Sequence, residues 1–343
     1  MSTPLTHNPK NAVTHTINRI THNGQLAVEK VLTSQNKEDT PTDWLASTTL
    51  NHWNYWQREA LVYQSDLAFH LNGTSTRLAN LLTVDEQNDK IAITLENING
   101  KTGHQLTLSD YTKIALAWGK AQGHLFQQPW QQPWLSTRFL FDYTHSKTVD
   151  YSLLDDNQAW QQPLIKDNWP QSLRDDLIFL YQHRSQLYEI VESSERVPCH
   201  LDFWPNNVFL DKNNLLVPID WAFFGHGAWG EDIANFIPDA VFDNFVPPEA
   251  LVQMQQTMIP AYLDGVTSSG VQLDVEQLQT IIYACAVKYV WLGPLLLEQA
   301  SRKHQQAYGG QVLQDASQQY RNRGAALQFL CGWAKQAISR SAH

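Results

Sequence analysis

The chain has 343 residues, of which 43% are hydrophobic and 17% charged, with a formal net charge of -10 at pH 7. This composition is typical of a folded globular protein, and the acidic balance argues against a nucleic acid or an anionic membrane as partner. Three widely spaced cysteines, a polar start and the lack of a long apolar run favour the reducing cytoplasm over export or a membrane span.

The first elements along the chain are two predicted strands at about 14–21 and 25–32. They are joined by Asn23-Gly24, a pair typical of a two-residue hairpin turn because both positions tolerate positive φ. Side chains alternate along a strand, so Lys30 shares a face with three apolar residues, Leu26, Val28 and Leu32. An inward-pointing lysine at this place is unusual.

The next pattern, from about Asp43 to His70, predicts a helix with Glu59 beside an apolar stripe. Residues 77–84 and 90–97 then read as two strands joined by the polar turn Asp85–Asp89. The first hundred residues are therefore expected to form a small sheet that carries one main helix.

Helical patterns dominate after Gly100, and the first helix has Ser109 or Asp110 as its expected N-cap. A stretch rich in Trp and Gln, between Gln127 and Pro198, is interpreted as a surface insertion. Beyond Asp232 the chain reads as mostly helical. The predicted fold is α+β and bilobal.

Residues 200–207 read H-L-D-F-W-P-N-N, and Asp220 follows at the end of the apolar run "LLVPID". A carboxylate can take a proton from a hydroxyl, while a second carboxylate and an amide oxygen can hold magnesium. Either half alone is better explained by a tight turn or a strand end. Their ordered pairing, each next to a hydrophobic strand, favours phosphoryl transfer.

The two segments "CHLDFWPNNVFL" and "VPIDWAFFGHGAWGEDIANF" resemble the aminoglycoside phosphotransferase and choline kinase families, which have a protein-kinase-like fold. The resemblance implies an N-terminal nucleotide-binding lobe, residues 1–98, and a C-terminal helical lobe with the catalytic loop and the acceptor site, residues 99–343. It also implies ATP, or GTP, as phosphoryl donor and magnesium as cofactor.

Carried over residue by residue, the resemblance makes Asp202 the base that takes the proton of the acceptor hydroxyl. Asn207 and Asp220 would bind magnesium at the nucleotide phosphates. His200 would hold the catalytic loop, and Asp232 in "EDIANF" would fix that loop from the next helix.

Lys30 would contact the nucleotide phosphates and pair with Glu59, although Glu29 and Arg58 offer rival pairings and both side chains could be solvated instead. The backbone from Glu96 to Ile98 would meet the adenine ring. The chain lacks the glycine-rich loop of kinases, so any phosphate loop is expected near residues 7–13, with contacts from Asn8, Lys10 and Asn11.

The function predicted from these residues is transfer of a terminal phosphoryl group to a hydroxyl of a small molecule, such as an aminoglycoside, choline, ethanolamine or a sugar. Trp204 and Trp221 flank the expected catalytic carboxylates and are candidates for acceptor contacts. Two alternatives stay open: an inactive kinase-like protein that binds nucleotide, and a metal-dependent hydrolase. The sequence leaves the oligomeric state open.

Overall fold

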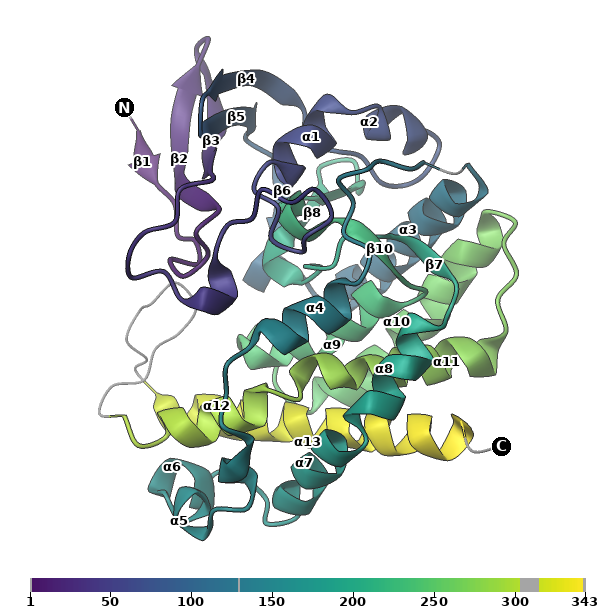
Figure 1. Cartoon of the computed structure of the whole chain (residues 1–343). Helices are drawn as coiled ribbons and strands as arrows, with labels where there is room; N and C mark the ends of the chain where they lie inside the picture. Colours follow the sequence, from purple (N-terminus) through teal and green to yellow (C-terminus); the bar gives the residue numbers. More distant parts are fainter. Residues whose placement is uncertain (1, 129, 303–314, 342–343) are drawn as a thin grey trace.

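The N-terminal lobe is built on a five-stranded antiparallel sheet with the strand order β1-β2-β3-β5-β4 (Figure 1). The computed structural model describes residues 2–128, 130–302 and 315–341. The strands are β1 Thr3–Pro4, β2 Thr14–His22, β3 Gln25–Thr33, β4 Leu81–Gln87 and β5 Lys90–Glu96.

The predicted hairpin is present, with Asn23 at φ 49° and Gly24 at φ 79° in the turn between β2 and β3. Lys30 points into the lobe and is 5% exposed, as the alternation along the strand predicted. Leu26 is the exception on that face, at 60% exposed, because the pairing of β3 with β5 begins only at Ala27.

The helix predicted from Asp43 to His70 is wrong over its first half. A short 3-10 turn at Thr42–Trp44 leads into loops and turns, and the helices are α1 Arg58–Gln64 and α2 Leu67–His70. The Asn54 side chain donates to two main-chain oxygens in the 44–45 segment, and such local bonds compete with helix formation. The strand predicted from residue 77 also starts later, at Leu81.

The C-terminal lobe is mainly helical, which gives the expected α+β fold (Figure 1). Its helices are α3 Leu108–Gln127, α4 Phe139–Ser146, α5 Asn157–Trp160, α6 Pro163–Lys166, α7 Leu173–Gln182, α8 Arg184–Glu192, α9 Glu231–Phe242, α10 Ala250–Ser268, α11 Val275–Ala284, α12 Leu292–Gln299 and α13 Ala316–Ser341. The N-cap of α3 is Thr107, in a capping box with Asp110, rather than Ser109 or Asp110.

Two small antiparallel sheets carry the segments around the candidate site. In one, β8 Val208–Asp211 lies between β6 Gly100–Thr102 and β9 Leu216–Pro218 and pairs with both. The other pairs β7 Arg196–Cys199 with β10 Gly225–Ala228. The chain passes from β5 to β6 at Asn97–Asn99. The predicted domain boundary, between residues 98 and 99, lies in this connection. The division into two domains stays a prediction.

Helices α3 and α10 approach each other closely because each has a glycine at the contact. A Cβ on Gly119 would lie 2.1 Å from the Tyr262 carbonyl oxygen, and one on Gly265 would lie 2.1 Å from that of Leu116. A larger residue at either position would push the helices apart. This contact fixes α3, which carries Trp118 next to the candidate catalytic loop.

The Trp-rich stretch after Gln127 is part of the core, so its interpretation as a surface insertion is wrong. Its tryptophans are at most 9% exposed and pack into the helical lobe at positions Trp130, Trp134, Trp160 and Trp169. The Trp130 indole donates to Asp66, which ties the stretch to the N-terminal lobe. The Gln neighbours of these rings are exposed or half-buried, so the apolar rings provide the buried surface of the stretch.

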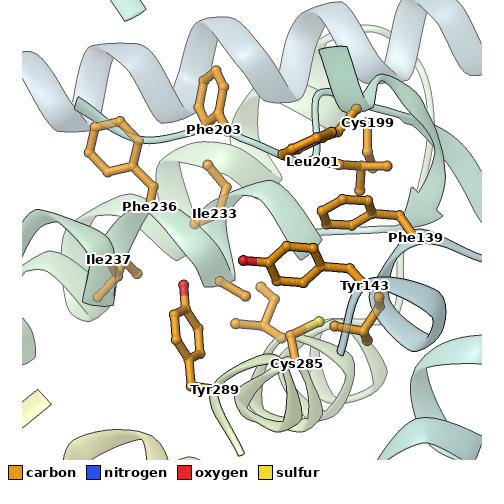
Figure 2. Packing of buried hydrophobic residues seen from close by; sticks show 14 of the residues in the cluster. Phe139, Tyr143, Cys199, Leu201, Phe203, Ile233, Phe236, Ile237, Cys285 and Tyr289 are labelled. Carbon is orange, nitrogen blue, oxygen red and sulfur yellow. The ribbon is translucent and has the colours of Figure 1, made fainter. Parts of the chain in front are cut away.

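One apolar run, Val275–Gln299, is long and apolar enough to cross a membrane, but 78% of its most apolar window is buried in the described structure. A core helix of a globular protein passes the same test. The run supplies Cys285 and Tyr289 to the core that also holds Leu201 and Phe203 of the motif segment (Figure 2).

Candidate active site

The loop that carries Asp202 is held by the buried carboxylate of Asp232, at the start of α9. This carboxylate accepts the main-chain N–H of His200 at 2.9 Å and of Leu201 at 2.7 Å, and the indole N–H of Trp118 at 2.8 Å. Leu201 has φ 67°, a conformation that a branched side chain seldom adopts. The expectation that Asp232 fixes this loop is confirmed by these hydrogen bonds.

The His200 ring joins the loop to the strand that precedes Asp220. Its Nε2 lies 2.9 Å from the Ile219 carbonyl oxygen, and its Nδ1 accepts the main-chain N–H of Asp202 at 3.3 Å. Burial lowers the pKa of His200 to about 4, so the ring is neutral at physiological pH. His200 therefore positions two segments and has no free nitrogen for acid or base chemistry.

Asp202 and Asn207 face each other across the loop. The Asn207 Nδ2 atom donates to the Asp202 carboxylate at 2.7 Å and to the Asp202 carbonyl oxygen at 3.0 Å. Burial and the neighbouring Asp220 raise the pKa of Asp202 to about 7, while Lys288 and Asn207 act in the opposite sense. A carboxylate in this setting is a suitable proton acceptor.

Asp220 lies beside Asn207 because the Ile219 N–H donates to the Asn207 carbonyl oxygen at 2.9 Å. Asp220 itself adopts φ 60°, and its side chain is 32% exposed. The Asn207 amide nitrogen is engaged with Asp202, which leaves its oxygen as a ligand. An amide and a carboxylate oxygen suit magnesium, which usually takes one or two protein carboxylates together with substrate phosphates. In the described ranges no three His, Cys, Asp or Glu side chains cluster as a metal site of their own.

Lys30 forms the ion pair with Glu59, at 2.6 Å, and a second one with Asp220, at 2.7 Å. The rival partners Glu29 and Arg58 make no ion pair with these two residues in the described structure. Burial alone would lower the pKa of Lys30, but the two carboxylates outweigh it and hold the pKa above its ordinary value. The contact with Asp220 was not predicted, because no local pattern relates β3 to the end of β9.

Arg58, next to Glu59 on α1, is a site residue that the sequence did not reveal. Its side chain is fully buried, and all of its donors bond to main-chain oxygens, those of Leu50, His52, Trp53, Trp134 and Ala222. The Ala222 oxygen, at 2.9 Å, belongs to the loop directly after Asp220. Arg58 thus ties the glutamate helix to the loop that follows the candidate metal ligand.

A cavity of about 660 Å³ lies in front of Asp202 and Asp220. The loop between β1 and β2 covers part of it with residues His7 to Asn11, which belong to the segment 7–13 expected to replace a glycine-rich loop. Side chains of α4, α9 and the α11–α12 connection form the opposite wall, among them Phe139, Tyr143, Lys147, Asp239 and Lys288.

Not every expected residue lines this cavity. Trp204 does, but Trp221 is fully buried against His200 and donates to the Pro218 carbonyl oxygen, so its assignment to the acceptor is wrong. Glu96 and Ile98 lie away from the cavity, at the connection between the lobes. The Glu96 side chain pairs there with Arg77, which also contacts Asp211 at 3.1 Å.

A strand lysine paired with a helix glutamate, above a helical lobe that presents an aspartate loop, is the arrangement of the protein-kinase-like class. The chain belongs to the phosphotransferase enzyme family, whose sequence profile matches residues 83–264, more than half of the chain. A comparison with curated proteins finds no match.

Solved structures with the same fold include antibiotic kinases. Amicoumacin kinase hAmiN, in complex with AMP-PNP, Ca2+ and Ami, is 12% identical, with a TM-score of 0.55 over 99% of this chain and 88% of the other. Spectinomycin phosphotransferase APH(9)-Ia, with ADP and spectinomycin, is 10% identical, with a TM-score of 0.51 over 97% and 93% of the two chains. A thermostable mutant of APH(4)-Ia, with AMP-PNP and hygromycin B, is 11% identical, with a TM-score of 0.51 over 100% and 95%. At these identities the likeness shows the fold.

Proposed function

We propose that this phosphotransferase is a small-molecule kinase that moves the terminal phosphoryl group of ATP to a hydroxyl of its acceptor, with magnesium as cofactor. The observation that carries the proposal is the shared cavity in front of Asp202 and Asp220, with Lys30 held against Asp220 by Glu59. The lobe of residues 1–98 would bind the nucleotide, and residues 99–343 would supply the acceptor site.

In this proposal, Asp202 accepts the proton of the acceptor hydroxyl, and the Asn207 amide holds the carboxylate in place at 2.7 Å. Lys30 binds a nucleotide phosphate, for which Glu59 and Asp220 position its ammonium. Magnesium, held by the Asn207 oxygen and the Asp220 carboxylate, would neutralise charge on the phosphates. Catalysis then rests mainly on positioning and charge.

The loop at His7–Asn11 is proposed to cover the phosphates in place of a glycine-rich loop. Its main chain is already shaped by Asn8, whose side-chain oxygen accepts the Lys10 N–H at 3.0 Å. Asn8, Lys10 and Asn11 line the cavity and offer side-chain donors that a glycine loop lacks. The main chain from Glu96 to Ile98 would meet the nucleotide base, with GTP as the rival of ATP.

The acceptor is proposed to be a hydroxylated small molecule, in line with the fold relatives that carry spectinomycin or hygromycin B in their structures. We place the enzyme in the cytoplasm, because Cys199, Cys285 and Cys331 are all free and buried thiols. No nucleic acid or membrane partner is proposed.

The test is a screen for nucleotide consumption across hydroxylated metabolites, with ATP or GTP and magnesium. Asp202→Asn should lower turnover by roughly 10²- to 10⁴-fold and leave nucleotide affinity unchanged, because only the proton acceptor is removed. Asp85→Asn, an exposed carboxylate on β4, is the matched control.

Two outcomes would replace the proposal. Tight nucleotide binding with no turnover on any acceptor would identify an inactive nucleotide-binding protein. Release of phosphate from esters in the absence of nucleotide would identify a hydrolase. Near-normal turnover by Asp202→Asn would contradict the assignment of the base.

A further inference from the structure

Lys288 stands out in the wall of the cavity opposite the nucleotide side. It lies in the 3-10 segment Cys285–Tyr289, is only 8% exposed and lines the cavity. Among the described residues its ammonium has no hydrogen bond and no ion pair; its near neighbours are the rings of Phe139 and Tyr289, each with its centre 5.8 Å away. An ammonium that faces a cavity without a protein partner is available to a ligand, and a hydrogen bond between two charged groups is stronger than one between neutral groups.

The other buried lysine of the cavity, by contrast, has partners of its own. Lys147 is also 8% exposed, but it has a carboxylate partner, Asp43, at 3.3 Å, and lies 3.9 Å from the ring centre of Trp44. Arg323 has Asp243 at 4.0 Å. Of the two buried lysines that line the cavity in the described ranges, only Lys288 has no ion pair or hydrogen bond with the protein. Its ammonium is therefore available to a ligand.

Two carboxylates in the same cavity flank Lys288 without pairing with it. The charge of Lys288 lowers the pKa of Asp202 and of Asp239 against the opposing effect of burial, so it lies close enough to both to act on them. Asp239 accepts the Tyr289 hydroxyl at 2.8 Å. The hydroxyls of Tyr143 and Tyr289 point into the space between the two rings (Figure 2), and both residues line the cavity.

We propose that Lys288 binds an oxyanion of the acceptor, so that the substrate is a hydroxylated compound carrying a carboxylate or a phosphate. The inference rests on the proposed function and names its substrate class. The reacting hydroxyl would lie at Asp202 and the oxyanion at Lys288, in one cavity. Asp239 would then face a donor group of the same molecule, such as an amine or a second hydroxyl.

The experiment measures binding with magnesium and the inert nucleotide AMP-PNP, by calorimetry, for two matched sets of compounds. One set is glycerol, glycerate and glycerol 3-phosphate; the other is glucose, glucuronate and glucose 6-phosphate. Each set changes only the anionic group, so it separates a carboxylate from a phosphate. Transfer from ATP is measured on the same compounds.

In at least one set, the wild-type protein should bind an anionic member about 10- to 100-fold more tightly than the neutral one, the range expected for a charged hydrogen bond in a buried site. Lys288→Met should abolish this preference without changing the affinity for the neutral compound. Lys288→Arg should keep most of it. Lys335→Met, an exposed lysine outside the cavity that pairs with Asp176, is the control.

The possible results distinguish failure of the anion site at Lys288 from failure of the proposed kinase activity. Equal binding of neutral and anionic members, or a preference that survives in Lys288→Met, overturns the inference. An equal loss of transfer to all acceptors in Lys288→Met, with unchanged binding, also overturns it, because the ammonium would then act on the transferred phosphoryl group. Transfer to neutral acceptors alone upholds the kinase and refutes the inference. Binding through Lys288 without any transfer upholds the anion site and refutes the kinase.

Discussion

The amide of Asn207 has two ends, one of which contacts Asp202 while the other is proposed to contact magnesium. Only its NH₂ group can donate to the Asp202 carboxylate, so the 2.7 Å hydrogen bond fixes which end of the amide faces the base. The amide oxygen is left for a cation. The geometry of the base and of the proposed metal site is therefore coupled through a single residue.

Asp220 is the residue at which the metal proposal can be tested without replacing the proposed base, although its charge also acts on the pKa of Asp202. Asp220→Asn keeps the shape but removes the charge, so the affinity for magnesium-ATP should fall by roughly 10- to 100-fold, as for other charged ligands in partly buried sites. Affinity for ATP in the presence of EDTA should change much less. Calorimetry with and without magnesium measures both, and Asp85→Asn is the exposed control on β4. An equal loss under both conditions would mean that Asp220 acts only by positioning Lys30.

At the scale of elements, the first two residues of α1 each contact a different part of the candidate site. Glu59 reaches Lys30 on β3, and Arg58 reaches the loop after Asp220 through the Ala222 oxygen. These contacts connect α1 both to β3 and to the loop after Asp220.

Arg58→Met should destabilise the protein by more than about 3 kcal/mol, because it leaves several main-chain oxygens without their buried donor. Arg58→Lys should cost less, since an ammonium still offers up to three donors, although not in a planar fork. The measurement is denaturant unfolding at equilibrium. Arg19→Met, an exposed arginine on β2, should change stability by less than about 0.5 kcal/mol. A similarly small effect of Arg58→Met would contradict the proposed tie.

The elements that the sequence predicted correctly are those with local causes. Asn23-Gly24 specifies the hairpin by itself, and the spacing from His200 to Asn207 brings these side chains into one loop. The features that were missed depend on distant partners. Arg58 donates a hydrogen bond to the main-chain oxygen of Ala222, 164 residues further along the chain, and no local sequence pattern predicts this contact.

The same reason, dependence on distant partners, explains the wrong helix and the failure to predict that Lys288 lines the cavity. Residues 45–57 have an apolar spacing compatible with a helix, but Asn54 bonds to the main chain of the preceding loop instead. Lys288 lies in an apolar helical run, and only the packing of that run against α4 and α9 turns its ammonium to the cavity. A single sequence shows which residues are present, but not which of them come together in the wall of the cavity.

For the molecule as a whole, Lys147 joins the two lobes. It projects from the segment after α4 into the N-terminal lobe, where Asp43 lies at 3.3 Å and the ring centre of Trp44 at 3.9 Å. From its own lobe the ring of Tyr143 lies 4.1 Å away. Asp43, Trp44 and Lys147 all line the cavity, so the contact between the lobes forms part of its wall.

Lys147 also gives the stability of the protein a defined pH dependence. Burial lowers its pKa to about 8 from the ordinary 10.5, with Asp43 acting against this effect and Lys10 and Lys288 adding to it. Between these two pH values the unfolded chain holds the proton and the folded protein has lost it. The unfolded state thus binds more protons, and the free energy of unfolding rises with pH over this interval.

The difference in unfolding free energy between wild type and Lys147→Met should accordingly change in favour of wild type from pH 8 to pH 10.5, by up to about 3 kcal/mol at ~1.4 kcal/mol per pKa unit. Denaturant unfolding at several pH values measures it, and buried tyrosines that also titrate affect both proteins alike. Lys212→Met, an exposed lysine, should give a curve parallel to wild type. Parallel curves for Lys147→Met as well would mean that its ammonium keeps an ordinary pKa, and that its contact with Asp43 and Trp44 compensates burial in full.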